Sequence, residues 1–235
     1  MKKIITILAG GTGKRMGNVK LPKQFLEICG IPVIVLTVRN ILSFGLFNKV
    51  VIVIHPEWKK YLMELLANYT VDISQIAFVD GGQERIQSIE NGLDYLKKSG
   101  AEDDDIVVIH DAVRPFASKA LFSNAVAETQ KYGATVAIVP AKDTMIVSEN
   151  GIAVDMPDRT KLFHGQAPDS FKFKILYDAL KSLSTDEMAT ITGTAQICQK
   201  KGIVIHTFLG EENNIKITTI EDMFLAKAIY EELYK

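Results

Sequence analysis

The strongest constraint on the fold is a repeated alternation of short apolar runs with helical patterns. Continuous runs rich in Val and Ile occur at residues 4–8, 49–54, 76–79, 106–109 and 135–139. Between them, apolar residues recur at helical spacing over residues 32–43, 57–69, 86–96 and 118–132. Strands that are apolar on both faces and are separated by helices are typical of a parallel sheet covered on both sides. We therefore expect an α/β fold with a mostly parallel central sheet between two layers of helices.

This rhythm stops between residues 141 and 166. Two short alternating runs, at residues 144–147 and 152–154, flank Asn150-Gly151, a strong signal for a β-hairpin turn. We expect a β-arm over about residues 141–166 that projects from the domain and provides a dimerisation surface. A hairpin folded back onto its own sheet is the alternative.

The chain beyond the arm returns to the first pattern. We expect helices at 172–183 and 194–201, a sixth strand at 203–207, and a last helix that begins with a capping box between Thr219 and Asp222. No linker or repeat separates these segments from the first half. Residues 1–235 are therefore expected to form a single domain that carries the arm.

Composition excludes several classes of protein. The net charge is −1, whereas proteins that bind nucleic acids usually carry a basic surplus. The apolar run at the N-terminus is too short for a signal peptide, and no apolar stretch approaches the ~20 residues that span a bilayer. Cys29 and Cys198 form neither a CxxC motif nor a ligand cluster, which favours free thiols in a reducing cytoplasm. We expect a cytoplasmic protein without nucleic-acid or membrane partners.

A glycine-rich segment with basic residues follows the first apolar run. Glycines within Gly10–Gly13 allow a sharp turn and a close approach of the backbone to a ligand, and Arg15 and Lys23 lie beside it. The spacing is not that of a P-loop, because Leu8 stands where the first glycine is required. Nor is it a dinucleotide fingerprint, because Met16 stands where the last glycine belongs. Taken alone, the segment is either a phosphate-binding loop or an ordinary turn with solvated cations.

Two further polar clusters follow predicted strands. Residues 80–88 come after the third apolar run and residues 110–115 after the fourth. In parallel sheets, ligands bind beyond the carboxyl ends of the strands. Because residues 10–17 follow the first strand in the same way, the sequence predicts one binding site built from all three clusters.

Six motifs recur in the order in which they occur in one enzyme family. They are Ala9-Gly10-Gly11-x-Gly13-x-Arg15-Met16 with Pro22-Lys23, Gly81-Gly82-x-x-Arg85-x-x-Ser88, His110-Asp111-Ala112-Val113-Arg114-Pro115, Asp143-Thr144, Arg159 with Gln166-x-Pro168-x-x-Phe171, and Asn214-Ile215-Lys216-Ile217-Thr218. The first resembles the signature of nucleotidyltransferases that activate sugar phosphates. The whole set resembles the cytidylyltransferases that act on polyol phosphates. This resemblance covers nearly the whole chain and implies a Rossmann-like three-layer nucleotidyltransferase fold.

The implied reaction transfers a cytidylyl group from CTP to a polyol phosphate and releases pyrophosphate. Both reactants are anions, so the chemistry needs cations and positioning above all. The resemblance implies that Arg15, Lys23 and Lys216 are the catalytic cations. It implies that the nucleotide is bound by Leu8, Ala9, Gly10, Gly11, Thr12, Gly13, Gly81, Gly82, Arg85 and Ser88.

The remaining implied residues concern the metal and the acceptor. Asp111 would hold Mg²⁺ or the ribose, as a hard oxygen ligand should. Thr144 and Arg159, which lie on the predicted arm, would bind the polyol phosphate and reach the site of a partner subunit in a homodimer. Asp111 could instead cap the following helix, and Arg159 could pair with Asp155 or Asp158.

Two neighbours of Asp111 have structural interpretations. We expect Arg114 to form a structural ion pair rather than to act in catalysis. We expect His110 to be a hydrogen-bonded structural residue rather than a base.

The motifs leave the acceptor open between two polyol phosphates. These are D-ribitol 5-phosphate, used for teichoic-acid and capsule polymers, and 2-C-methyl-D-erythritol 4-phosphate, used for isoprenoid precursors. Phe25 and the segment 163–166 resemble the ribitol enzymes, whereas Ala112 favours the other group. We expect the ribitol phosphate.

Two other kinds of protein remain open from the sequence. Ala167, Gly193 and Asn213 depart from the family pattern, so a nucleotide-binding homologue with weakened activity is one alternative. A uridylyl- or guanylyltransferase for a hexose phosphate, sharing only the first loop, is the other.

Overall fold

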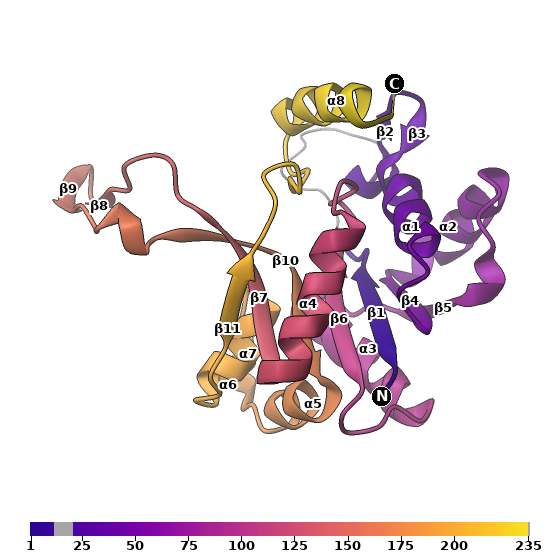
Figure 1. Cartoon of the computed structure of the whole chain (residues 1–235), viewed down its shortest axis with the longest axis horizontal. Coiled ribbons are helices and arrows are strands. Elements are labelled where there is room, and N and C mark those ends of the chain that lie inside the picture. Colours follow the sequence, from indigo (N-terminus) through magenta and orange to yellow (C-terminus); the bar gives the residue numbers. More distant parts are fainter. Residues whose placement is uncertain (12–20, 235) are drawn as a thin grey trace.

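The computed structural model describes residues 1–11 and 21–234. Over these residues, seven strands form a central sheet in the order β11-β7-β10-β6-β1-β4-β5, with helices on both faces (Figure 1). The strands are β1 (Lys3–Leu8), β4 (Lys49–Ile54), β5 (Ile76–Asp80), β6 (Ile106–Asp111), β7 (Ala134–Pro140), β10 (Phe163–Lys172) and β11 (His206–Leu209). Only β10 runs antiparallel to its neighbours in this sheet, β6 and β7. The expected mostly parallel sheet is confirmed.

The central strands are apolar on both faces because both faces are covered. Successive side chains of a strand point to opposite sides of the sheet. Ile5 and Ile7 of β1 therefore belong to one hydrophobic cluster and Ile4 and Leu8 to another. The first cluster packs against α1 (Val33–Ser43), α2 (Pro56–Asn68) and α4 (Lys119–Tyr132), and the second against α3 (Arg85–Lys98), α5 (Phe173–Lys181) and α7 (Thr194–Lys200).

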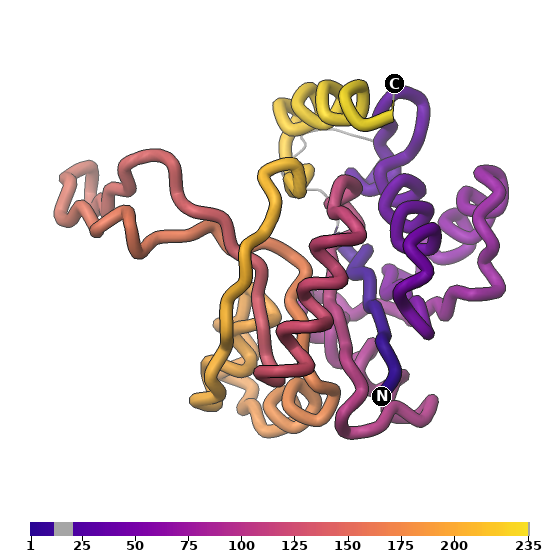
Figure 2. Tube along the Cα trace, in the orientation of Figure 1, coloured from indigo at the N-terminus to yellow at the C-terminus, as the bar shows by residue number. Residues whose placement is uncertain are grey.

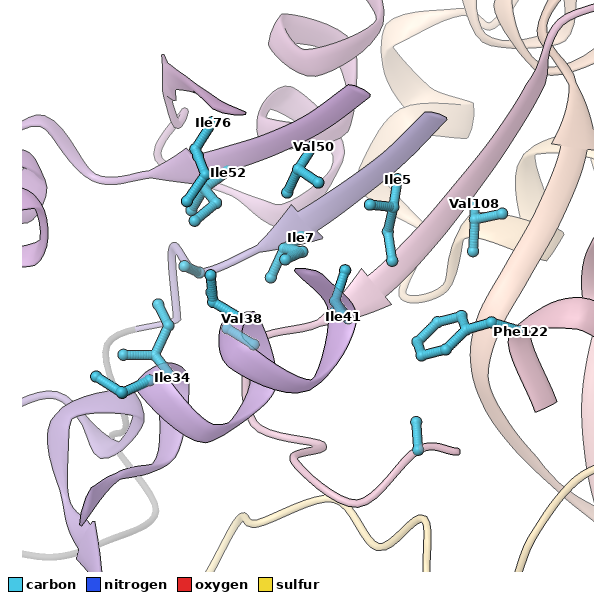
Figure 3. Close-up of a cluster of buried hydrophobic side chains, with 14 of the residues drawn as sticks. Ile5, Ile7, Ile34, Val38, Ile41, Val50, Ile52, Ile76, Val108 and Phe122 are labelled. Atoms are coloured by element: carbon cyan, nitrogen blue, oxygen red, sulfur yellow. The ribbon is translucent and has the colours of Figure 1, made fainter. Parts of the chain in front are cut away.

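The first of these clusters shows how the layers fit together. Figure 3 shows Ile5 and Ile7 of β1 facing side chains of α1 such as Val38. Val50 and Ile52 extend the same surface along β4 (Figure 3). The helical spacing of the apolar residues of α1 thus corresponds to its buried face, as the sequence predicts.

The C-terminal helix lies above the carboxyl ends of the strands. α8 (Ile220–Tyr234) packs on the short hairpin of β2 (Glu27–Ile28) and β3 (Ile31–Pro32), as Figures 1 and 2 show. Its predicted capping box is present: Thr219 N donates to Asp222 Oδ2 at 2.8 Å, and Asp222 N donates to Thr219 Oγ1 at 3.4 Å. None of the described helices is long and apolar enough to cross a membrane.

The predicted arm is a separate two-stranded hairpin that extends away from the body (Figures 1 and 2). It consists of β8 (Val147–Glu149) and β9 (Ile152–Asp155). Asn150 and Gly151 both have positive φ, at 50° and 82°, which suits the two-residue hairpin turn predicted there. The alternative of a hairpin folded back on the main sheet is wrong.

Several elements differ from the sequence prediction, among them the first strand of the arm, which was expected at 144–147 and is β8 at Val147–Glu149. The strand β10 and the short helix α6 (Thr185–Ala189) were not predicted, and the sixth predicted strand at 203–207 is instead β11, which begins at His206. β10 contains Gly165 and Pro168, residues depleted in strands, and has a register shift between Gln166 and Asp169. Its strand conformation depends on pairing with neighbours on both sides, which no local pattern encodes.

The short 3₁₀ turns complete the described chain. They are η2 (Lys23–Phe25), η3 (Ile73–Gln75) and η4 (Arg159–Lys161). The first lies at the cleft described below, and the last lies on the arm.

Candidate active site

A cleft of about 280 Å³ opens beyond the carboxyl ends of β1, β5 and β6, where the polar clusters were predicted to meet. Most of the predicted site residues line it: Leu8, Ala9, Gly10, Gly11, Lys23, Gly82, Arg85, Ser88, Asp111 and Lys216. These residues come from five separate segments of the chain. Described residues of all three polar clusters thus line one cleft, as expected for a single binding site.

The other predicted residues lie elsewhere. Thr12, Gly13 and Arg15 lie outside the described residues. Gly81 directly precedes Gly82, at the wall of the cleft. Thr144 and Arg159 are exposed on the arm and do not line this cleft.

The contacts of Arg159 differ from the ion pairs with Asp155 or Asp158 that the sequence left open. Its Nη1 donates to the carbonyl oxygen of Lys142 at 2.8 Å. Asp158 instead accepts from Thr160, from the backbone N–H at 3.0 Å and from the hydroxyl at 2.7 Å. Within the described chain, neither Asp155 nor Asp158 forms an ion pair with Arg159, so the alternative of a local ion pair is wrong.

Glycines bring the backbone of one wall close to Ser88. The Ser88 hydroxyl accepts from Gly82 N at 3.1 Å and donates to the Glu84 carbonyl at 3.2 Å. A Cβ on Gly82 would lie 2.2 Å from Gln87 Cβ, so no side chain fits at this position. A Cβ on Gly81 would lie 3.2 Å from Ser88 Oγ. The result is a narrow wall of backbone groups at the start of α3.

Asp111 is the electrostatic centre of the site. It ends β6 and is only 4% exposed. Its Oδ1 accepts from Arg85 Nη1 at 2.9 Å, while its Oδ2 lies 3.2 Å from Arg114 Nε and 3.0 Å from Lys216 Nζ. Burial alone would raise the pKa of this carboxyl, but the three cations outweigh burial and hold the pKa well below its usual range. Asp111 is therefore ionised.

The three cations reach Asp111 from three parts of the chain. Arg85 is the first residue of α3, Arg114 lies in the turn after β6, and Lys216 lies in the irregular segment before α8. Asp111 does not cap the following helix, because Ser118 Oγ accepts from Leu121 N at 3.1 Å and takes that role. The alternative of a helix cap is wrong.

Arg114 and His110 have the structural contacts expected of them. Arg114 is buried and pairs with Asp111, and its carbonyl oxygen lies 3.1 Å from His110 Nε2. Burial lowers the pKa of His110 to about 4, so the ring is neutral near pH 7.

Lys23 and Gln24 form the opposite wall. Lys23 Nζ donates to the carbonyl oxygen of Ile217 at 3.0 Å, which joins η2 to the segment that carries Lys216. Gln24 is buried and its Nε2 donates to the Ala9 carbonyl at 2.8 Å, at the end of β1. Sequence reasoning missed Gln24 as a cleft residue, although its position inside Pro22-Lys23-Gln24-Phe25 was a usable signal.

The donor set at Asp111 fits a divalent cation only together with substrate oxygens. A carboxylate offers about four lone-pair sites, and the cations described above occupy three of those on Asp111. Among residues 1–11 and 21–234, no group of three or more His, Cys, Asp or Glu side chains could hold a metal ion. Mg²⁺ takes one or two protein carboxylates and completes its shell with phosphates and water. Asp111 fits that pattern as a single protein ligand.

The charge of the cleft suits a polyanion. Lys23, Arg85 and Lys216 line it, and Asp111 and Glu84 are its acidic lining residues. Arg114 adds a further positive charge behind Asp111. Preorganised cations in a partly enclosed site stabilise negative charge that develops during a reaction. The arrangement can therefore bind a phosphate chain and support substitution at phosphorus.

Comparisons with known proteins agree with this chemistry. The family model described as 2-C-methyl-D-erythritol 4-phosphate cytidylyltransferase matches residues 3–232. The ribitol-5-phosphate cytidylyltransferase of Lactiplantibacillus plantarum is 34% identical over 227 residues, which are 96% of this chain and 97% of that protein.

Two solved structures have a similar fold. The 2-C-methyl-D-erythritol 4-phosphate cytidylyltransferase of Francisella tularensis superimposes with a TM-score of 0.82 at 25% identity, over 97% of this chain and 100% of that one. The 4-diphosphocytidyl-2C-methyl-D-erythritol synthase of Anaerococcus prevotii gives a TM-score of 0.80 at 25% identity, over 98% and 96% of the two chains.

Proposed function

Since the chain belongs to the 2-C-methyl-D-erythritol 4-phosphate cytidylyltransferase family and is a CTP-dependent nucleotidyltransferase, we propose that its acceptor is D-ribitol 5-phosphate. The observation that carries this proposal is the 34% identity to a ribitol-5-phosphate cytidylyltransferase over nearly the full length of both chains. The products would be CDP-ribitol and pyrophosphate.

The cleft supplies the groups that the nucleotide half of the reaction needs. The backbone of Gly10 and Gly11 and the nearby Lys23 would contact the triphosphate, as would Arg15, which lies outside the described residues. Gly81, Gly82 and Ser88 would border the cytosine, because a backbone without side chains can approach a flat ring closely. Lys23 and Lys216 would stabilise the charge that develops as an oxygen of the acceptor phosphate attacks the α-phosphorus and pyrophosphate leaves.

A divalent cation, Mg²⁺ in this proposal, would neutralise phosphate charge when it binds together with CTP. Asp111 is the residue that would hold it. This role is compatible with the ion pairs of Asp111, because Arg85 is the only described group bonded to Oδ1.

The acceptor would bind through the arm of a partner subunit in a homodimer. Thr144 and Arg159 are exposed on this arm, away from the cleft of their own chain. Apolar side chains are exposed along the same segment: Met145, Ile146, Val147, Ile152, Val154 and Met156. Contiguous exposed apolar surface of this kind marks an interaction site. The proposal places the enzyme in the cytoplasm, where both anionic substrates are dissolved.

A pyrophosphate-release assay with CTP and Mg²⁺ tests the acceptor. D-ribitol 5-phosphate is expected to give a kcat/KM at least about tenfold above that of 2-C-methyl-D-erythritol 4-phosphate, a difference of about 1.4 kcal/mol in transition-state binding. The reverse order would favour the methylerythritol phosphate, the second candidate, which the name of the matching family model supports. CTP binding without turnover of either would show a homologue with weakened activity.

Lys23→Ala tests the assignment of the cleft itself. Loss of one preorganised cation at the phosphates is expected to lower kcat by about 10²–10³-fold. A melting curve measured beside the rate establishes that the variant is folded. A wild-type rate would contradict the assignment.

A further inference from the structure

Lys216 lies in a segment whose position does not come from a helix or a strand. Residues 210–219 connect β11 to α8 without regular secondary structure, apart from a turn at 212–213. Within this segment, Asn214 N donates to the Glu211 carbonyl at 3.1 Å, and Ile217 N donates to the Val113 carbonyl at 3.0 Å. The placement of Lys216 over Asp111 therefore depends on contacts with the body of the protein, which include the Ile217–Val113 bond and the bond from Lys23 to the Ile217 carbonyl.

Asn214 provides such contacts, two residues before Lys216. It is completely buried, with 0% exposure. Its Nδ2 donates to the Ala167 carbonyl at 2.6 Å and to Gln166 Oε1 at 3.2 Å. Its own carbonyl oxygen accepts from Arg114 Nη1 at 2.7 Å.

The same Arg114 side chain reaches the centre of the site. Its Nε lies 3.2 Å from Asp111 Oδ2, the oxygen that Lys216 Nζ also contacts at 3.0 Å. A continuous set of hydrogen bonds thus runs from the Asn214 backbone through Arg114 to Asp111. Asn214 and Lys216 are therefore connected both along the chain and through this carboxylate.

On its other side, Asn214 is anchored at the base of the arm. Gln166 belongs to β10, whose first residues pair with β7 where the arm leaves the sheet. Gln166 also holds Glu211, because its Nε2 donates to the Glu211 carbonyl at 2.9 Å and its Oε1 accepts from Glu211 N at 3.2 Å. The close approach depends on Gly210, where a Cβ would lie 2.5 Å from Gln166 Oε1.

We propose that Asn214 is a positioning residue, which fixes the 210–219 segment to β10 and thereby holds the Lys216 ammonium at Asp111. The inference rests on the catalytic role proposed above for Lys216. Buried amide hydrogen bonds suit this task because they have defined directions and are costly to leave unpaired. Asn214 itself is buried behind the cleft and does not line it. Its effect on the reaction passes through Lys216.

The test is a double-mutant cycle between Asn214→Ala and Lys216→Ala, with kcat and KM for CTP measured under saturating acceptor. Asn214→Ala is expected to lower kcat by about 10–100-fold, since a displacement of about 1 Å in a site can cost that much. The loss of kcat/KM in Asn214→Ala should be divided between kcat and KM in the same proportion as the loss in Lys216→Ala. In the Lys216→Ala background, Asn214→Ala should change kcat by no more than about twofold, because residues that act as a unit are not additive.

Two further variants distinguish a loss of positioning from simple unfolding. Asn214→Asp keeps the volume of the side chain but removes both Nδ2 hydrogen bonds, and it should lower kcat in the same direction. Asn48→Ala is a control at an exposed asparagine: Asn48 Oδ1 accepts from Lys3 N at 2.8 Å at the far end of the sheet, and the variant should keep the wild-type kcat. Circular dichroism and melting curves establish that each variant is folded.

The outcomes separate this inference from the proposal on which it rests. If Lys216→Ala retains full activity, the catalytic role of Lys216 fails and the inference falls with it. If Lys216→Ala is inactive while folded Asn214→Ala and Asn214→Asp keep the wild-type kcat, only the inference is wrong. It is also wrong if Asn214→Ala causes its full loss in the Lys216→Ala background, because Asn214 then acts by another route.

Discussion

Replacing Asp111 with Asn should destabilise the fold by an amount set by its three cation contacts. The substitution keeps the side-chain volume and removes the negative charge that Arg85, Arg114 and Lys216 all contact. Removing one partner of a buried ion pair costs about 3–5 kcal/mol. Arg85 and Lys216 are about one third exposed and can be partly solvated, so we expect the lower end, about 3 kcal/mol. For a chain of this size, that lowers the melting temperature by about 6–12 °C.

The pH dependence of this difference has a defined sign. The pKa of Asp111 is depressed in the folded state, so its stabilisation is present above the unfolded-state pKa of about 3.9. It is lost as the pH falls toward the folded-state pKa. The difference in the free energy of unfolding between wild type and Asp111→Asn should be constant between about pH 5 and 8. It should shrink by about 1.4 kcal/mol per pH unit in the acid range.

Urea unfolding followed by circular dichroism at several pH values measures both quantities. Asp80→Asn is the control, because Asp80 pairs with Lys59 at a similar distance, 2.9 Å, but is 58% exposed. Exposed pairs contribute about 0–1 kcal/mol, so this variant should be nearly as stable as the wild type. An Asp111→Asn variant as stable as the wild type near neutral pH, or a gap that widens on acidification, would refute the reasoning.

Three further predictions concern the cleft wall, the arm and the thiols. Gly82→Ala should weaken CTP binding, measured by calorimetry, at least about tenfold. The new Cβ would lie 2.2 Å from Gln87 Cβ and would displace the wall of the cleft. An unchanged affinity would place the cytosine elsewhere. Ile152→Asp, at a 67% exposed position on the arm, should convert the proposed homodimer to monomers in sedimentation velocity, whereas a dimer that persists would exclude this face. Burial raises the pKa of the Cys198 thiol to about 12, so a disulfide reagent at about pH 8 should label only the exposed Cys29 in the folded chain and both thiols after denaturation.

The parallel part of the sheet was predictable because its signal is local. β1, β4 and β6 are continuous Val and Ile runs, and burial on both faces requires that composition. The position of the cleft followed from the same prediction, since parallel strands end at one edge. The Asn150-Gly151 turn was equally clear, because positive φ at two successive residues is a local property.

Other features could not be predicted because they depend on partners distant in sequence. β10 contains Gly165 and Pro168, and its sequence is typical of a loop. Hydrogen bonds with β6 and β7 nevertheless make it a strand. β11 begins three residues later than expected because its pairing with β7 starts at His206. Gln24 was overlooked because its importance lies in one hydrogen bond to Ala9, at the end of β1.

The sequence by itself determined the layers of the fold and the family chemistry, because buried strands, helical faces and ordered motifs are written in short stretches of residues. It could not determine that Arg85, Arg114 and Lys216 meet at one carboxylate, since these residues lie in segments that only folding brings together. Nor could it show that Asn214 joins Gln166 to the segment of Lys216. Electrostatic and hydrogen-bond energies depend on distances of a few ångströms between side chains, and the tertiary structure sets those distances.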